Sequence, residues 1–186
     1  MSVLTEKQKN YHLRKMRTRM KRVDATGDGY ISREDYELIG IRLAKYGGMS
    51  KKKAEETRVA FLRVADQLGL HPGVKIPVEE AAVNASKSLL NMKGKEKEES
   101  LALCGIMYDL IDADEDGYIS LPEFKAFLQS MGPEITDEKV KWCFNTLDFN
   151  NNGRISRDEF MTAADDFMHG VEETPIANAF YGDLVD

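Results

Sequence analysis

The sequence predicts an all-α protein in which four helix–loop–helix units form two pairs, packed as one compact globule around an apolar cavity. Three observations predict this fold class. An oxygen-rich pattern of 12 residues occurs three times in one register, apolar residues at helical spacing flank each copy, and a fourth segment keeps the spacing without the oxygen side chains. A repeat of this kind is typical of one supersecondary unit used several times.

The first copy is DATGDGYISRED, from Asp24 to Asp35. Ca²⁺ takes roughly six to eight oxygen ligands, which a loop of this length supplies from positions 1, 3, 5, 7, 9 and 12. The ligands expected here are Asp24, Thr26, Asp28, Tyr30 through its backbone carbonyl, Ser32 and Asp35. Asp at position 12 is one methylene shorter than the usual Glu, which predicts weaker Ca²⁺ binding and tolerance of Mg²⁺ at this loop.

Two further copies are better formed, DADEDGYISLPE at 112–123 and DFNNNGRISRDE at 148–159. Each has Gly at position 6 for the sharp turn and Glu at position 12 to clamp the ion, which is the EF-hand motif. The expected ligands are Asp112, Asp114, Asp116, Tyr118, Ser120 and Glu123 in one, and Asp148, Asn150, Asn152, Arg154, Ser156 and Glu159 in the other, with Tyr118 and Arg154 acting through their carbonyls. Ligand-position carboxylates number four in loop 112–123, three in the first loop and two in loop 148–159, so we expect loop 112–123 to bind tightest.

EF-hands occur in pairs, and a fourth unit is predicted between the first and third. Aligning Ile76 with the isoleucines of the other loops places Gly69, His71 and Gly73 at positions 1, 3 and 5, and none of these can hold Ca²⁺. We therefore expect a degenerate loop around 69–80, with His71 as an exposed loop residue. Ile76 is expected to pair with Ile31 in a short antiparallel bridge, as Ile119 pairs with Ile155.

The helices follow from apolar stripes on either side of the loops. These stripes are Leu13, Met16, Met20 and Val23 with Tyr36, Ile39 and Leu43, then Cys104, Tyr108 and Ile111 with Phe124, Phe127 and Met131, then Val140, Phe144 and Leu147 with Phe160 and Phe167. Ser32, Ser120 and Ser156 are each followed three residues later by Asp or Glu, which predicts capping boxes at the outgoing helices.

The polar stretch from Asn91 to Ser100 is predicted to be a linker between an N-terminal pair, 1–92, and a C-terminal pair, 93–186. The second pair includes a C-terminal extension, 171–186. This extension suits either a helix laid over an internal cavity or an additional core helix.

Composition narrows the class of protein. The chain is 42% hydrophobic and 31% charged, and no apolar run approaches the ~18 residues of a membrane span. A polar start without a secretory segment, together with two cysteines expected to be reduced thiols, favours the cytoplasm. The net charge of −6, with eight basic residues and one acid in residues 1–22, suits cation loops downstream of a basic helix and makes nucleic acid a poor candidate partner.

Four stretches together carry a family resemblance that spans nearly the whole chain. They are YHLRKMRTRMKRVDATGDGYISREDYELI, AEETRVAFLRVADQLGLHPGVKIPVEEAAVNAS, SLPEFKAFLQSMGPEITDEK and ANAFYGDLV. The chain resembles the coelenterazine-binding, or luciferin-binding, proteins of sea pansies and related anthozoans. The resemblance implies a monomeric cytoplasmic carrier, not an enzyme, that holds the luciferin coelenterazine in an apolar cavity. It also implies that the carrier gives its cargo to a separate luciferase when Ca²⁺ rises.

Two other EF-hand groups remain alternatives, the sarcoplasmic calcium-binding proteins, which buffer calcium, and the calcium-regulated photoproteins, which emit light. His169 and Tyr181 match two members of the photoprotein Tyr-His-Trp cluster, but no tryptophan follows Trp142. Asp186 replaces the terminal proline of photoproteins, and Met16 replaces their histidine in the first helix. His169 is therefore interpreted as a pocket-edge or surface histidine.

The luciferin-contacting residues are predicted from the helical stripes. Arg19 on the flank of the Met16 and Met20 stripe and Tyr36 on the facing helix are the first candidate donors, and Arg22 is a third. The remaining candidates are Met16, Met20, Tyr108, Trp142, Phe180 and Tyr181. The alternatives are a solvated face for the basic residues and ordinary core packing for the apolar ones.

Calcium is expected to act on the cavity through the helices. Ca²⁺ binding reorients the outgoing helix of a sensor EF-hand, so a cavity built from these helices should change shape. Three bound Ca²⁺ would also neutralise the formal charge of −6, which should favour docking to a luciferase.

Overall fold

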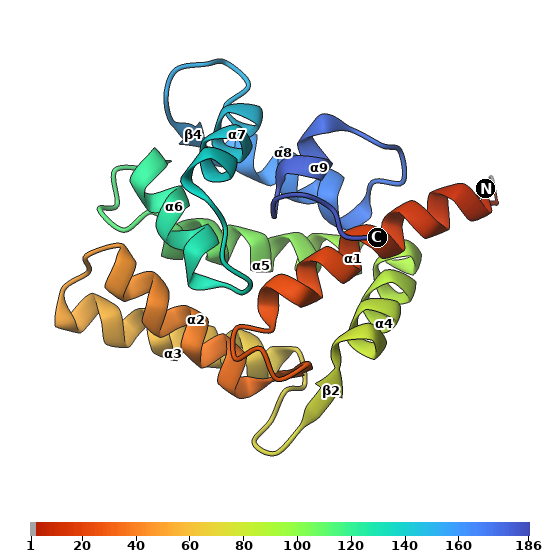
Figure 1. Ribbon diagram of the computed structural model, residues 1–186, viewed down its shortest axis with the longest axis horizontal. Helices are drawn as coiled ribbons and strands as arrows, with labels where there is room; N and C mark the ends of the chain where they lie inside the picture. The colour runs from red at the N-terminus through yellow and green to blue at the C-terminus, as the bar shows by residue number, and fades with distance from the viewer. Residues whose placement is uncertain (1–2) are drawn as a thin grey trace.

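The computed structural model describes residues 3–186 and confirms the predicted all-α class (Figure 1). Its elements are α1 Glu6–Val23, β1 Tyr30–Ser32, α2 Arg33–Tyr46, α3 Lys51–Gln67, β2 Lys75–Pro77, α4 Val78–Asn91, α5 Lys95–Ile111, β3 Tyr118–Ile119, α6 Leu121–Ser130, α7 Asp137–Leu147, β4 Ile155–Ser156, α8 Arg157–His169 and α9 Pro175–Ala179. No helix among these residues is both long enough and apolar enough to span a bilayer.

The loops are joined two by two through short antiparallel strands. β1 pairs with β2 and places Ile31 opposite Ile76, while β3 pairs with β4 and places Ile119 opposite Ile155. Both predicted isoleucine pairings are confirmed. The degenerate loop therefore keeps its structural partnership with the first loop although it has no ligand side chains.

The outgoing helices begin at the predicted serines. Ser32, Ser120 and Ser156 are the N-cap residues of α2, α6 and α8, and each forms a capping box with the acidic residue three positions later. That acidic residue is also position 12 of the loop. The same carboxylate thus ends the loop and starts the helix, which couples the loop to the helix direction.

The predicted linker is shorter than expected. α4 continues to Asn91 and α5 begins at Lys95, so only residues 92–94 lie outside helices. The prediction of a linker from Asn91 to Ser100 was wrong because its Lys and Glu residues are good helix formers, and they make up the first turns of α5.

Contacts within each pair and between the pairs build one core (Figure 1). α1 packs on α4 and α2 on α3, while α5 packs on α8 and α6 on α7. α2 contacts α6 and α1 contacts α8, so the two pairs meet along these helices. α9 packs on α7 and α8, and buried Phe180 just beyond α9 lies 5.5 Å from Phe167 between ring centroids.

Candidate functional site

The three oxygen-rich loops share one pattern of internal hydrogen bonds. The carboxylate at position 1 accepts the backbone N–H groups of positions 5 and 6, at 3.1 and 3.0 Å for Asp24, 3.2 and 2.9 Å for Asp112, and 3.1 and 2.8 Å for Asp148. The glycine at position 6 makes this wrap possible, because it adopts a positive φ in each loop, as +88° at Gly117 shows. The loops are therefore folded around their first ligand.

The carboxylate at position 12 closes each loop in the same way. One of its oxygens accepts the N–H of the position-9 serine at 2.8 Å in all three loops. The other accepts the N–H of position 3, at 3.0 Å for Asp35, 3.3 Å for Glu123 and 3.2 Å for Glu159. The shorter Asp35 thus reaches across its loop as the two glutamates do.

The donor set and spacing of loop 112–123 fit a hard cation. Within residues 3–186, one group of at least three acidic, His or Cys side chains has ligand atoms close enough for a shared metal, namely Asp112, Asp114 and Asp116, whose oxygens lie within 4.8 Å of one another. Burial raises the pKa of Asp112, and the nearby Glu123 and Asp116 raise it further. A divalent cation would relieve this repulsion, which agrees with the expected rank of this loop.

The other two loops offer fewer charges to a cation. In loop 148–159, burial opposes the charge of Glu159, yet hydrogen bonds from Ser156 and Asn150 lower its pKa. In loop 24–35, the Thr26 hydroxyl donates to Asp35 Oδ1 at 2.9 Å, so positions 3 and 12 are bonded to each other. A cation in this first loop must replace that bond, which agrees with weaker binding there.

The degenerate loop lacks the ligand side chains of the other three loops. Its positions 1 and 5, Gly69 and Gly73, adopt φ of +79° and +87° and have no side chain to offer. The side chain of His71 at position 3 is 66% exposed, so its prediction as an exposed loop residue is confirmed.

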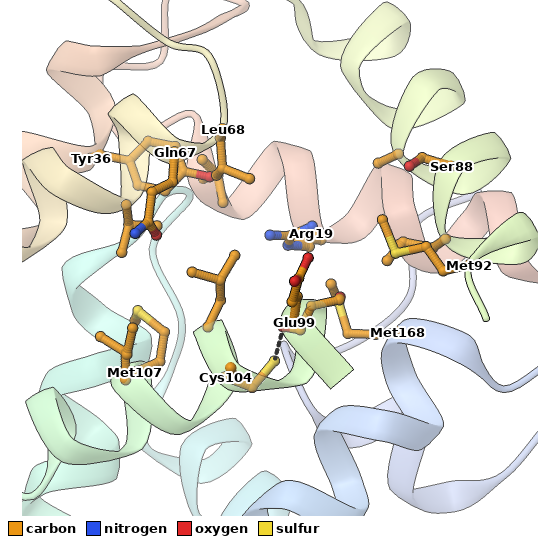
Figure 2. Close-up of a pocket in the computed structure, with 18 of the residues that line it drawn as sticks. Arg19, Tyr36, Gln67, Leu68, Ser88, Met92, Glu99, Cys104, Met107 and Met168 are labelled. Atoms are coloured by element: carbon orange, nitrogen blue, oxygen red, sulfur yellow. Dashed lines mark hydrogen bonds between the residues drawn. The ribbon is translucent and has the colours of Figure 1, made fainter. Parts of the chain in front are cut away.

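Between the two pairs lies an apolar cavity of about 1060 Å³ (Figure 2). Its apolar wall includes Val23, Ile39, Phe61, Val64, Leu89, Leu103, Phe127, Met131 and Met168. Exposed residues such as Gln67, Leu68 and Ser88 also line it, so the cavity opens to solvent beside the end of α3 and along α4 and α5. The volume is at the upper end of ordinary ligand sites, about 300–1,000 Å³.

Three polar side chains contribute donors to the cavity. Arg19 projects into it from α1, between Tyr36 and Met168 in the view of Figure 2. Burial raises the pKa of Tyr181 to about 12, with Arg19 acting against this shift, and burial also raises the pKa of Tyr36. Burial opposes the charge of Arg19, but its contacts with Tyr181 and Tyr36 leave its pKa raised. At neutral pH Arg19 is therefore a cation and the two phenols are neutral, while Lys87, Glu96 and Glu99 also line the site and Glu99 lies beside Arg19 in Figure 2.

Four of the nine predicted luciferin-contacting residues line the cavity, namely Arg19, Tyr36, Phe180 and Tyr181. The other five, Met16, Met20, Arg22, Tyr108 and Trp142, are not among the residues that line this cavity. A helical wheel shows which residues share a stripe, but the neighbouring helices decide which part of that stripe meets a cavity.

Each of the five has another place in the structure. Met16 and Met20 are core residues, 0% and 7% exposed. The Arg22 guanidinium donates to the backbone oxygens of Leu128 and Pro133.

The two aromatic residues are explained by their contacts. The Tyr108 hydroxyl donates to the backbone oxygens of Gly117 at 2.8 Å and Ile155 at 3.1 Å, which links loops 112–123 and 148–159. Trp142 is 40% exposed, with Lys139 Nζ 4.5 Å from the centre of its ring system. His169 is also corrected, because its side chain is only 8% exposed and bonds Asp165 at 2.9 Å instead of lying at the surface or the cavity edge.

Sequence reasoning missed the methionines that do line the cavity. The cavity is lined by Met92, Met107, Met131 and Met168, which come from four different segments. The methionines predicted from the sequence were Met16 and Met20 of α1. Met fits irregular apolar surfaces because its side chain is flexible and polarisable. The sequence shows that the chain is rich in methionine, with nine residues, but it does not show which of them line a cavity.

The chain is similar to known proteins in both sequence and fold. Residues 16–39 match an EF hand model, and residues 103–164 match an EF-hand domain pair. The luciferin-binding protein of Renilla reniformis is 67% identical over 182 residues, covering 98% of this chain and 99% of the relative.

Solved structures give the same picture. The calcium-loaded apo form of the coelenterazine-binding protein from Renilla muelleri matches with a TM-score of 0.91 and 67% identity, covering 97% of this chain and 100% of that one. The photoprotein clytin matches with a TM-score of 0.71 at 19% identity, covering 100% of both chains, and shows a shared fold alone.

Proposed function

The chain belongs to the luciferin-binding protein family, and from that membership we propose that it is a calcium-triggered carrier of coelenterazine. The luciferin occupies the apolar cavity at low calcium. Calcium binding to the three loops releases it to a separate luciferase. We place this monomeric carrier in the cytoplasm.

One observation supports the calcium trigger above all others. Two residues of the cavity wall adjoin the first loop in the chain, since Val23 directly precedes Asp24 at position 1 and Tyr36 directly follows Asp35 at position 12. Closing the loop on a cation moves both neighbours, because positions 1 and 12 are drawn to the same ion. The cavity wall cannot then keep its shape.

The second pair contributes to the wall in the same manner. Cys104 and Met107 come from α5, which enters loop 112–123, and Phe127 comes from α6, which leaves it. Met168 comes from α8, the outgoing helix of loop 148–159. Every functional loop is therefore connected to the cavity by at least one helix that lines it.

The coupling must be reciprocal. If calcium lowers luciferin affinity by a given factor, luciferin lowers calcium affinity by the same factor, commonly about 5- to 150-fold, or about 1–3 kcal/mol. Calcium titrations of the loaded and empty carrier should differ by that amount. Identical curves would contradict the trigger.

The chemistry of the cavity suits an aromatic heterocycle with oxygen acceptors. Its wall is mostly apolar, and Arg19, Tyr36 and Tyr181 supply donors. An imidazopyrazinone carbonyl or a phenolic oxygen would accept from them, while the surrounding methionines and aromatic rings cover its flat faces.

The size of the cavity favours a carrier over a calcium buffer. A buffer requires only the loops, whereas an unfilled space of about 1060 Å³ forfeits a large amount of core packing.

One spectroscopic experiment separates the three classes. The calcium-free protein is mixed with coelenterazine, passed through a desalting column and examined for protein-bound visible absorbance, and calcium is then added without and with a luciferase. A carrier retains the absorbance, loses it on calcium addition in the dark, and supports light only when luciferase is present. A buffer retains no absorbance, and a photoprotein emits light unaided, and either result would contradict the proposal.

A further inference from the structure

The degenerate second loop contributes a charged side chain to the first loop. Lys75 Nζ lies 2.8 Å from Asp28 Oδ2, and Asp28 is position 5 of the first loop. We propose that Lys75 is an affinity-determining residue of that loop, a tethered cation whose charge opposes Ca²⁺ binding there. The proposal requires that the first loop bind calcium, and it does not depend on luciferin.

Strand pairing holds Lys75 in position. β2 runs antiparallel to β1 with Lys75 opposite Ser32, and Val78 N–H donates to Gly29 O at 3.0 Å just beyond the strands. The loop after α1 and β2 lie next to each other at one end of the molecule (Figure 1). The lysine therefore cannot move away from the first loop without breaking the bridge, although its side chain can swing.

The two carboxylate oxygens of Asp28 have different partners, and Lys75 bonds Oδ2. Asp28 Oδ1 accepts the N–H of Tyr30 at 3.0 Å, which is part of the internal pattern of the loop. Oδ2 bonds the Lys75 ammonium, so part of the negative charge of Asp28 is already neutralised by a cation fixed beside the loop. The ammonium also repels a divalent ion in the loop, because like charges so close together oppose each other.

The second pair of loops provides an internal comparison. Lys75 is position 7 of the degenerate loop, and position 7 of loop 148–159 is Arg154. The Arg154 guanidinium carbon lies 3.6 Å from the centre of the Tyr118 ring, and Asp116, the counterpart of Asp28, makes no ion pair with any residue in 3–186. Lys75 Nζ also lies near a ring, 6.0 Å from the centre of Tyr30, but only in the first pair is the cation bonded to a ligand carboxylate.

The consequence is an order of filling. In the first loop Thr26 is bonded to Asp35, and the Lys75 ammonium is bonded to Asp28, so calcium meets a fixed positive charge there. Loop 112–123 has four ligand carboxylates with no such cation. We expect the first loop to fill last, which makes it the loop whose occupancy requires the highest calcium concentration.

The test uses the full chain and reads each loop separately. The backbone amides of Gly29, Gly117 and Gly153 lie at position 6 of the three loops and report occupancy in an NMR titration with CaCl₂. In Lys75→Met we expect the Gly29 midpoint to fall by about three- to tenfold, while the Gly117 and Gly153 midpoints stay within about twofold. Lys75→Arg keeps the charge and should restore a midpoint close to that of the unchanged protein.

Lys53→Met is the matched control. Lys53 pairs with Glu115, position 4 of loop 112–123, which is not a ligand position, so the variant removes the same charge beside another loop. We expect it to shift the Gly117 midpoint by less than about twofold. A Gly29 shift in Lys75→Met below about twofold, or one no larger than the control shift, would overturn the proposal. A Lys75→Arg midpoint equal to that of Lys75→Met would also overturn it.

Discussion

His12 Nε2 lies 2.8 Å from the backbone oxygen of Met168, so a buried imidazole of α1 bonds the helix that carries a cavity residue. Its Nδ1 lies 2.8 Å from the Ser86 hydroxyl of α4. Because the carbonyl can only accept, Nε2 carries the hydrogen and Nδ1 accepts from Ser86. One neutral histidine thus joins three helices.

Protonation of His12 should destabilise the fold. Burial lowers its pKa from 6.5 to about 4. The unfolded chain therefore binds a proton at higher pH than the folded one, and stability is lost as the pH falls from 6.5 toward 4, by on the order of 3 kcal/mol. Chemical denaturation of His12→Gln should show a flatter curve in this window, whereas His71→Gln on the exposed loop should match the unchanged protein. Equal slopes for all three would contradict the assignment.

Lys15 should give a dependence at alkaline pH. Its fully buried side chain donates to the backbone oxygens of Asp166 at 2.9 Å and Gly170 at 2.7 Å, and burial lowers its pKa from 10.5 to about 8. Between these values the unfolded chain holds the proton and the folded chain does not, so stability rises with pH by up to about 3 kcal/mol. The measurement is the unfolding free energy of the unchanged protein minus that of Lys15→Met, from pH 7 to 10.5. A difference that falls with pH would refute this interpretation.

Loop 112–123 should bind calcium more tightly than the other two loops. We expect Glu123→Gln to remove the tightest site in a calorimetric calcium titration, and Glu159→Gln to remove a weaker one, because loop 112–123 concentrates four ligand carboxylates against two. Asp35→Asn should affect the calcium-binding curve only at the highest concentrations. If the site lost in Glu123→Gln is the weakest of the three, the ranking is wrong.

The cavity donors should matter for luciferin and not for folding. Arg19→Met keeps the length of the side chain and removes its donors, and we expect coelenterazine affinity to fall about 10- to 100-fold, as for loss of a charged hydrogen bond. Trp142→Ala is the control, since Trp142 is 40% exposed and outside the cavity lining. Fluorescence titration of both variants checks this. Equal losses in the two would show that affinity follows general stability.

Arg22 should be a structural residue. Its guanidinium donates to the backbone oxygens of Leu128 and Pro133, and its replacement by Met leaves both without their partner. We expect the unfolding free energy to fall by about 2–4 kcal/mol, with luciferin affinity changed little in the protein that remains folded. Arg17→Ala removes an exposed pair with Glu79 and should cost less than about 1 kcal/mol. Similar losses in both variants would argue against the role given to Arg22.

The metal loops could be located from the sequence because coordination is a local requirement. An ion held by a single loop demands oxygens at positions 1, 3, 5, 9 and 12, and Asp112 to Glu123 meets this within twelve consecutive residues. The capping serines follow from the same short spacing, and the pairing of Ile31 with Ile76 follows from the alignment of the fourth segment with the repeat.

The cavity and its donors depended on packing between distant segments. Arg19, Met92, Cys104 and Tyr181 meet around one space although they are far apart in the chain, and no spacing rule connects them. Tyr108 and Trp142 occur in helices of the expected kind, but the Tyr108 hydroxyl bonds a calcium loop and Trp142 is exposed to solvent. Periodicity identifies the buried side of a helix, but a cavity is the volume that several buried sides leave unfilled, and that volume exists only once all the helices are placed.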